Sequence, residues 1–154
     1  MITIEQLIKQ PKFKCEGNRA VVSILYASGL INSYFESVFK KFDITLQQFN
    51  ALRILRGQYP KPCTVNLIRD RMLDKMSDAS RIVERLRKAG LVERTTSKTD
   101  RRAVDVLITQ KGLSLLSEID KMEKELTLPH SKLTEAEAKQ LNNLIEKVFD
   151  SLLG

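Results

Sequence analysis

The hydrophobic period of this chain changes after Gly90, and that change limits the folds that the chain can adopt. Up to Gly90 the apolar residues recur every three or four positions, as they do along helices that bury one face. Between Val92 and Ile108 they alternate with other residues, which is typical of strands. The polar, basic segment 95–102 interrupts this alternation and is the expected tip of a hairpin. From Thr109 the helical period returns, so the sequence predicts a mainly α fold with one small β-hairpin.

Capping residues and helix breakers divide the helical part into segments. Thr45, Thr64 and Thr109 each precede a periodic apolar run and can cap its first turn. Thr134 is followed three residues later by Glu137, which is a capping-box pattern. The predicted helices span residues 19–42, 45–57, 64–72, 76–89, 109–129 and 134–152. The core positions expected along the later helices are Phe49, Leu52, Leu55, Val65, Ile68, Met72, Leu113, Leu116, Ile119, Met122, Leu126, Leu141, Leu144, Ile145, Val148 and Leu152.

The positive charge of the chain is concentrated in its middle third. The whole chain has 26 Lys and Arg against 19 Asp and Glu, a net charge of +7. Residues 53–111 carry 15 basic and 7 acidic side chains, a net charge of +8, and the remainder carries −1. This concentration of positive charge favours a polyanionic partner. The alternative is a basic surface that only keeps the protein soluble.

Motifs for catalysis or metal binding are missing from the sequence. It contains no Gly-rich phosphate loop, nucleophile elbow or paired-carboxylate motif, so we do not expect an enzyme. The single histidine, His130, has no clustered cysteines or histidines that could share a metal ion. We therefore expect neither a metal nor a cofactor.

The predicted helix around residues 77–89 separates apolar from polar side chains. At about 100° per residue, one arc holds Ala79, Ile82, Val83, Leu86 and Ala89. The opposite arc holds Ser77, Asp78, Ser80, Arg81, Arg85 and Lys88. A helix divided in this way can dock by its apolar side and present arginines to guanine in the major groove of DNA. An ordinary amphipathic surface helix is the alternative interpretation.

The neighbours of this helix favour duplex DNA as its partner. The short helix before it completes a helix-turn-helix, and the hairpin after it carries Lys98, Arg101 and Arg102 at its tip. A basic hairpin beside a recognition helix forms a winged helix-turn-helix, whose wing can enter the minor groove. No aromatic residue lies between residues 60 and 148, so this segment has no rings on which unpaired bases could stack. A winged module that docks an acidic protein is an alternative, but such a surface favours exposed aromatics.

Three segments together resemble the multiple-antibiotic-resistance regulator (MarR) family of bacterial transcription factors. They are ITLQQFNALRIL (44–55), SRIVERLRKAGLVER (80–94) and DRRAVDVLITQKG (100–112). The most specific motif is the wing pattern formed by Asp100, Arg102, Val104 and Gly112, and the resemblance spans about residues 19–153. It implies a homodimer that binds a pseudo-palindromic site in double-stranded DNA and regulates transcription, as a repressor or, alternatively, as an activator.

The resemblance also assigns roles by position. The groove-facing residues it implies are Ser77, Asp78, Ser80, Arg81 and Arg85. In the wing, Arg102 matches the arginine that enters the minor groove, and Asp100 matches the residue that positions the wing. Lys98 and Arg101 match residues that contact phosphates or lie at the wing tip. The implied organisation is a DNA-binding lobe over residues 44–109, and a helical dimerisation region formed by residues 1–43 and 110–154. Dimerisation would also bury the apolar outer faces of those terminal helices.

Relatives in this family bind small phenolic or anionic ligands between the dimerisation helices and the DNA-binding lobe. An aromatic acid would suit an aromatic wall with one cation, and the candidate ligand-binding residues here are Tyr26, Tyr34, Phe49 and Arg53. The alternative is that these four residues serve packing or lie on the surface.

Cys15 is a candidate for redox sensing. One branch of the family senses hydroperoxides through a cysteine near the start of its first long helix, a few residues before a tyrosine. In this sequence Val22 occupies that position and Cys15 lies seven residues earlier, which departs from the pattern. Lys12 and Lys14 beside Cys15 could still activate its thiol. The alternative is an inert thiol.

The location expected from the sequence is the cytoplasm. Two cysteines, Cys15 and Cys63, are too few for a disulfide framework, and Cys63 is expected in a short strand. Glu5 and Lys9 interrupt the apolar core that a signal peptide needs. The longest uncharged run, residues 20–35, is too short and too polar for a membrane span, so we expect no membrane association.

Overall fold

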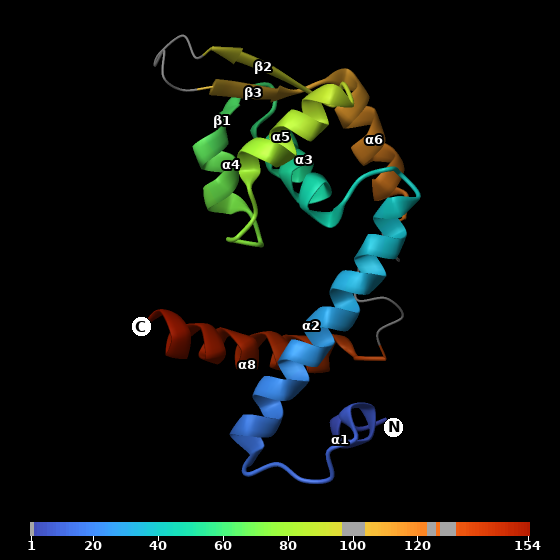
Figure 1. Ribbon diagram of the computed structural model, residues 1–154, viewed down its shortest axis with the longest axis vertical. Coiled ribbons are helices and arrows are strands. Elements are labelled where there is room, and N and C mark those ends of the chain that lie inside the picture. Colours follow the sequence, from blue (N-terminus) through green and yellow to red (C-terminus); the bar gives the residue numbers. More distant parts are fainter. Residues whose placement is uncertain (1, 97–103, 123–125, 127–131) are drawn as a thin grey trace. The chain divides into compact units, whose positions relative to one another are not determined.

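A computed structural model describes residues 2–96, 104–122, 126 and 132–154 (Figure 1). Its elements are α1 (Ile4–Ile8), α2 (Glu16–Lys40), α3 (Leu46–Gln58), β1 (Cys63–Thr64), α4 (Val65–Arg71), α5 (Ala79–Lys88), β2 (Val92–Thr96), β3 (Val104–Ile108), α6 (Gln110–Asp120) and α8 (Glu135–Leu153). The predicted fold class, mainly helical with a small hairpin, is confirmed. The chain divides into two compact units, Met1–Ile119 and Asp120–Gly154.

Local hydrogen bonds begin the helices where the sequence predicts. The Thr45 hydroxyl accepts a bond from the Gln48 amide at 3.2 Å, and the Gln48 side chain accepts one from the Thr45 amide at 2.8 Å. Thr64 caps α4 through the Leu67 amide at 3.1 Å. Thr134 and Glu137 form the predicted capping box at the start of α8. These bonds satisfy amides that have no partner within the helix, which is why the helices begin there.

The sheet is antiparallel, with its strands in the order β1-β3-β2. In the hairpin, Val92 pairs with Ile108 and Thr96 pairs with Val104. The two-residue strand β1 adds Cys63 opposite Val106, which confirms the short strand predicted there. Strand and hairpin therefore follow the alternation in the sequence. The predicted basic tip lies mostly within residues 97–103, outside the described residues.

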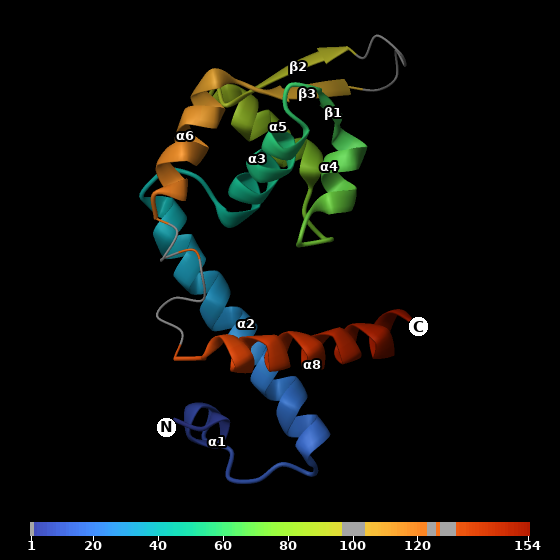
Figure 2. The ribbon, with the colours of Figure 1, turned by 180° about the vertical axis from the view of Figure 1, so that it is seen from behind.

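The core of the first unit lies where α3, α4 and α5 meet under the sheet, as Figures 1 and 2 show from opposite sides. The fully buried side chains there include Leu52, Leu55, Ile68, Leu86 and Val106. The end of α2 joins this core through an aromatic stack, because the rings of Phe39 and Phe49 lie 4.2 Å apart between centroids. Most of the predicted core positions of α3 and α4 are thus confirmed, although Val65 is only half-buried.

Three predicted helix boundaries are wrong, and the first is the start of α2, which lies at Glu16 and not at residue 19. Helix α5 begins at Ala79 and not near Met76, because Asp74 holds the preceding residues in a turn by accepting bonds from the Met76 amide and the Ser77 hydroxyl. Helix α6 ends at Asp120, one residue after its last buried side chain, Ile119, and residues 121–122 form a turn. The longer helix predicted to residue 129 therefore stops early. Much of its remainder, including His130, lies outside the described residues.

Helix α8 has its predicted apolar stripe. Leu141, Leu144, Val148 and Leu152 are 41%, 52%, 38% and 77% exposed, so their burial stays a prediction that depends on the expected dimer. Periodicity shows that a helix has an apolar face but not which surface covers it. In the described part of the chain, no helix is both long and apolar enough to cross a membrane.

Candidate nucleic-acid interface

Helix α5 is the second helix of a helix-turn-helix whose first helix is α4. Its inner face buries Ala79, Val83 and Leu86, and Ile82 is half-buried. Ala89, which the wheel places on the apolar arc, is exposed because it is the capping residue at the end of the helix. The apolar contacts to α3 and α4 fix which side of α5 faces away from the core.

The opposite face of α5 presents cations and a hydroxyl to solvent. Ser80, Arg81, Arg85 and Lys88 are all exposed, and the Arg81 side chain is 83% exposed. This face has the donors that a major groove requires, on a helix of about three turns, since about 3.6 residues make one turn. The sequence-predicted residues Ser80, Arg81 and Arg85 are therefore brought together on one surface.

Ser77 and Asp78 lie before α5 and support its first turn. Asp78 is the N-cap: its Oδ1 accepts a bond from the Arg81 amide at 3.0 Å, and its Oδ2 lies 3.2 Å from Arg81 Nε. Ser77 is half-buried and its hydroxyl donates to Asp74 Oδ2 at 2.9 Å. Both residues thus have a structural task next to the face on which Arg81 lies.

An ion-pair cluster connects α5 to the base of the hairpin. Glu84 accepts two bonds from the Arg87 guanidinium, at 2.8 and 3.1 Å, and one from Arg94 on β2 at 3.2 Å. These bonds, above all those from Arg87, lower the pKa of the Glu84 carboxyl to about 2. This cluster was not predicted from the sequence, although the i,i+3 spacing of Glu84 and Arg87 is a local signal for part of it.

The end of α5 is held by the start of α6. Gly90 has a φ of 72°, and its carbonyl accepts a bond from the Thr109 hydroxyl at 2.8 Å. Lys111 Nζ donates to the Ala89 carbonyl at 2.8 Å, which places a cation at the negative end of the helix. The Thr109 hydroxyl also accepts a bond from the Gly112 amide, so it caps α6 as predicted. This contact between Ala89–Leu91 and residues 109–112 is called the α5–α6 joint below.

Known regulators match this chain over most of its length. The HTH-type transcriptional repressor IacR of Pseudomonas putida is 30% identical over 125 residues, which are 80% of this chain and 74% of that protein. A sequence profile described as the MarR family matches residues 42–103. The chain belongs to the MarR family. Because its relatives are transcriptional regulators, it is a DNA-binding transcriptional regulator and not an enzyme.

Two similar MarR-family structures contain DNA. The complex of S. aureus MepR with DNA has a TM-score of 0.69 and 25% identity, covering 84% of this chain and 96% of that one. The C80S mutant of E. coli MarR bound to operator DNA has a TM-score of 0.68 and 25% identity, covering 81% of this chain and 89% of that one. These structures support double-stranded DNA as the partner of this regulator.

The wing of this MarR-family chain is described only at its base, in β2 and β3. Lys98, Asp100, Arg101 and Arg102 lie outside the described residues, so their assigned roles stay predictions. Gly112, the last residue of the wing motif, lies in α6. A side-chain carbon at that position would lie 2.4 Å from the Leu91 carbonyl oxygen. The family motif therefore has a glycine where the α5–α6 joint leaves no room for a side chain.

The four candidate ligand-binding residues lie on α2 and α3. Phe49 is buried against Phe39, and the guanidinium carbon of Arg53 lies 5.8 Å from the centroid of the Phe49 ring. Tyr26 and Tyr34 are half-buried on α2. A pocket between α2, α3 and residues 72–74 is lined by other side chains, among them Asn32. The structure thus pairs Phe49 with Arg53 and leaves the ligand prediction untested.

The two cysteines differ in their surroundings. Cys15 is exposed and is the N-cap of α2, where its Sγ accepts a bond from the Asn18 amide at 3.4 Å. Redox sensing by Cys15 stays a prediction. Cys63 is buried in β1, and this burial raises the pKa of its thiol, which disfavours the reactive thiolate form.

Proposed function

We propose that this protein is a homodimeric repressor that binds a pseudo-palindromic operator and acts in the cytoplasm. The observation that carries the proposal is the exposed face of α5. It holds Ser80, Arg81 and Arg85 on a helix whose other side is fixed by the core. On this proposal the two copies of α5 in a dimer enter successive major grooves about one helical turn apart.

The side chains have separate tasks in this proposal. Arg81 and Arg85 donate to guanine edges, and Ser80 donates to a base or a phosphate. Ser77 and Asp78 hold the first turn of α5 at the groove, as their bonds to Asp74 and to the Arg81 amide suggest. In the wing, Arg102 enters the minor groove, Asp100 positions it, and Lys98 and Arg101 contact phosphates.

Exposed apolar side chains support the homodimer. On α2, Val21, Leu25 and Leu30 are 56%, 68% and 56% exposed, and on α8 Phe149 and Leu152 are 53% and 77% exposed. Soluble proteins bury surfaces of this kind against a partner. The proposal therefore assigns residues 1–43 and 110–154 to dimerisation and residues 44–109 to DNA binding, and a symmetric dimer matches a symmetric operator.

Release from DNA is assigned to a small phenolic or anionic effector. The observation that supports this effector is the guanidinium of Arg53 beside the Phe49 ring, because a cation next to an aromatic side chain suits an aromatic anion. An effector can release the operator only if it binds more tightly to a dimer whose lobes are spaced wrongly for successive grooves.

Selection of duplexes from a random pool, followed by sequencing, tests the proposal. The wild type should enrich an inverted repeat with half-sites about one helical turn apart. Arg81→Ala should lose discrimination at one position of each half-site by about 5- to 150-fold, the range for one bidentate contact. Lys41→Ala, which removes a charge outside residues 44–109, is the control and should keep the wild-type preference. Failure to enrich any duplex would instead favour a protein-docking module.

A further inference from the structure

The hairpin of β2 and β3 packs into the core at its base. Val92 at the start of β2 and Ile108 at the end of β3 are buried and lie opposite each other in the ladder. Beyond Val92, residues 93–96 of β2 are all exposed, and β2 is an outer strand of the sheet. Because narrow antiparallel ribbons twist more than wide sheets, burial at the base does not by itself fix the direction of outer β2 relative to α5.

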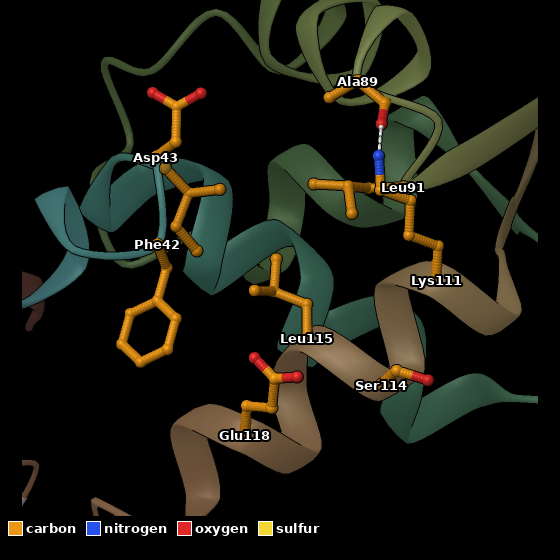
Figure 3. Close-up of a pocket in the computed structure, with 9 residues that line it drawn as sticks. Phe42, Asp43, Ala89, Leu91, Lys111, Ser114, Leu115 and Glu118 are labelled. Carbon is orange, nitrogen blue, oxygen red and sulfur yellow. Dashed lines mark hydrogen bonds between the residues drawn. The ribbon is translucent and has the colours of Figure 1, made fainter.

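The α5–α6 joint fixes α5 and the start of β2 to each other at one place. Figure 3 shows the Lys111 side chain reaching the Ala89 carbonyl, to which its Nζ donates at 2.8 Å. The Thr109 amide donates to the Leu91 carbonyl at 3.0 Å. A single fixed place allows the outer part of β2 to tilt relative to α5, so a second contact is needed to hold its direction.

The second contact is the bond between Arg94 and Glu84. Arg94 lies two residues beyond Val92, and its Nη1 donates to Glu84 Oε2 at 3.2 Å. Among the residues that the structure describes, this is the only side-chain hydrogen bond between β2 and α5. Glu84 lies five residues before Ala89, which is about 7.5 Å along the helix axis from the joint. Two contacts separated by that distance hold β2 at one angle to α5.

The geometry of the cluster suits a fixed brace. Arg87 donates to both oxygens of the Glu84 carboxylate, so the acceptor of the Arg94 bond is itself held in place. The planar guanidinium and the charge on both partners make such bonds strong and directional. The Arg94 side chain is 34% exposed, compared with 83% for Arg81. Arg94 is therefore engaged within the protein, whereas Arg81 is open to a groove.

We propose that Glu84 is a positioning residue for the wing. The role rests on the proposed function, in which α5 reads the major groove and the wing enters the neighbouring minor groove. By holding Arg94, Glu84 sets the angle at which the hairpin leaves α5, and so the distance between the two groove contacts. Glu84 acts through Arg94 and does not touch DNA. The pair thereby determines which base pairs are accepted beside each half-site, where a narrow A·T-rich minor groove attracts arginine.

Fluorescence anisotropy with two labelled duplexes tests this role in the full-length protein. Both duplexes carry the half-sites enriched from the random pool, with flanks of A·T pairs in one and G·C pairs in the other. The wild type should prefer A·T flanks by about five-fold or more, the lower end for one base pair. Glu84→Gln and Arg94→Gln should each reduce this preference below about two-fold, and the double variant should lose no more than either single one.

The flank preference separates positioning from the other roles of these residues. Partial unfolding lowers the affinity for both duplexes by the same factor and leaves their ratio unchanged. The two substitutions change the net charge in opposite directions, so a charge effect on DNA binding would have opposite signs in the two variants. If Arg94 contacts a phosphate directly, Arg94→Gln weakens both duplexes alike and reduces the salt dependence, and the flank preference persists.

Glu93→Gln is the matched control. Glu93 precedes Arg94 on β2 and is exposed, and within the described ranges no ion pair includes it. Its substitution makes the same change of charge as Glu84→Gln and should keep the preference for A·T flanks.

Four results would refute the positioning role. They are a wild type without flank preference, an unchanged preference in Glu84→Gln or in Arg94→Gln, additive losses in the double variant, and an equal loss in Glu93→Gln. A wild type that binds none of the enriched duplexes would instead refute the proposed function.

Discussion

Gly112→Ala is the substitution whose effect the structure defines most sharply. The new methyl carbon would lie 2.4 Å from the Leu91 carbonyl oxygen and 2.7 Å from Ile108 Cγ1. The carbonyl cannot move away freely, because it accepts a bond from the Thr109 amide at 3.0 Å. The methyl group therefore forces the first turn of α6 away from the end of α5.

The free energy of unfolding that Gly112→Ala loses is the sum of three contributions. Overpacking a dense core costs about 1–3 kcal/mol, and loosening the Thr109–Leu91 hydrogen bond costs about 1 kcal/mol. Replacing glycine by alanine inside a helix returns about 1 kcal/mol. The net loss in free energy of unfolding is about 2 kcal/mol. For a chain of this size, that loss lowers the melting temperature by about 4–8 °C.

Thermal unfolding followed by circular dichroism measures this loss, with Gly57→Ala as the matched control. Gly57 is also helical, but a methyl carbon there would meet no atom within 4 Å. Gly57→Ala should therefore keep or raise the melting temperature, by up to about 1 kcal/mol of added stability. If Gly112→Ala melts at or above the wild-type temperature, the close approach at the α5–α6 joint is not the reason for this glycine.

Three further predictions concern charge and assembly. With about eight phosphates neutralised per dimer, log K for a duplex should fall with log[salt] at a slope near −7, and a flat response would exclude DNA backbone contacts. Leu25→Glu should yield a monomer in sedimentation experiments; a dimer would contradict the proposed interface. Because the pKa of Glu84 is lowered to about 2, its stabilising effect is complete above about pH 4.5 and lost as the pH falls toward 2. In urea unfolding, the difference between the wild type and Glu84→Gln should stay constant from about pH 7 to 5 and narrow below 4.5; an unchanged difference at pH 3 would refute the ion-pair assignment.

The helix starts at Thr45, Thr64 and Thr134 could be predicted because each depends on a bond between residues three apart. The hairpin could be predicted for a similar reason, since alternation within a strand specifies its pairing faces. The start of α5 could not be predicted from the sequence. Ser77 and Asp78 are both capping residue types, and the choice between them depends on Asp74, which holds Ser77 in the preceding turn.

The missed features of the interface depend on contacts distant in sequence. Arg94 reaches Glu84 only because β2 folds back along α5, and no local pattern shows that approach. The sequence includes Gly112 in a family motif, but the reason for glycine is the Leu91 carbonyl, 21 positions earlier in the chain. The surface that covers the α8 stripe could not be predicted from the sequence, because a periodic pattern looks the same whether it packs within one chain or against a second.

The ion pairs on α5 affect how this regulator would move among sites on a chromosome. Glu84 binds Arg87 and Arg94, and Asp78 lies beside Arg81, so part of the positive charge in this region is balanced within the protein. A surface whose charges are paired in this way has a lower affinity for non-specific DNA, because non-specific binding depends on cations that are free to contact phosphates. If the protein binds an operator as proposed, each encounter with other DNA sequences would therefore be brief, and the search for the operator would lose less time on them. On the proposed function, Arg81 would leave Asp78 where a base offers a better partner, so the protein would discriminate between sites by the time it stays bound as well as by affinity.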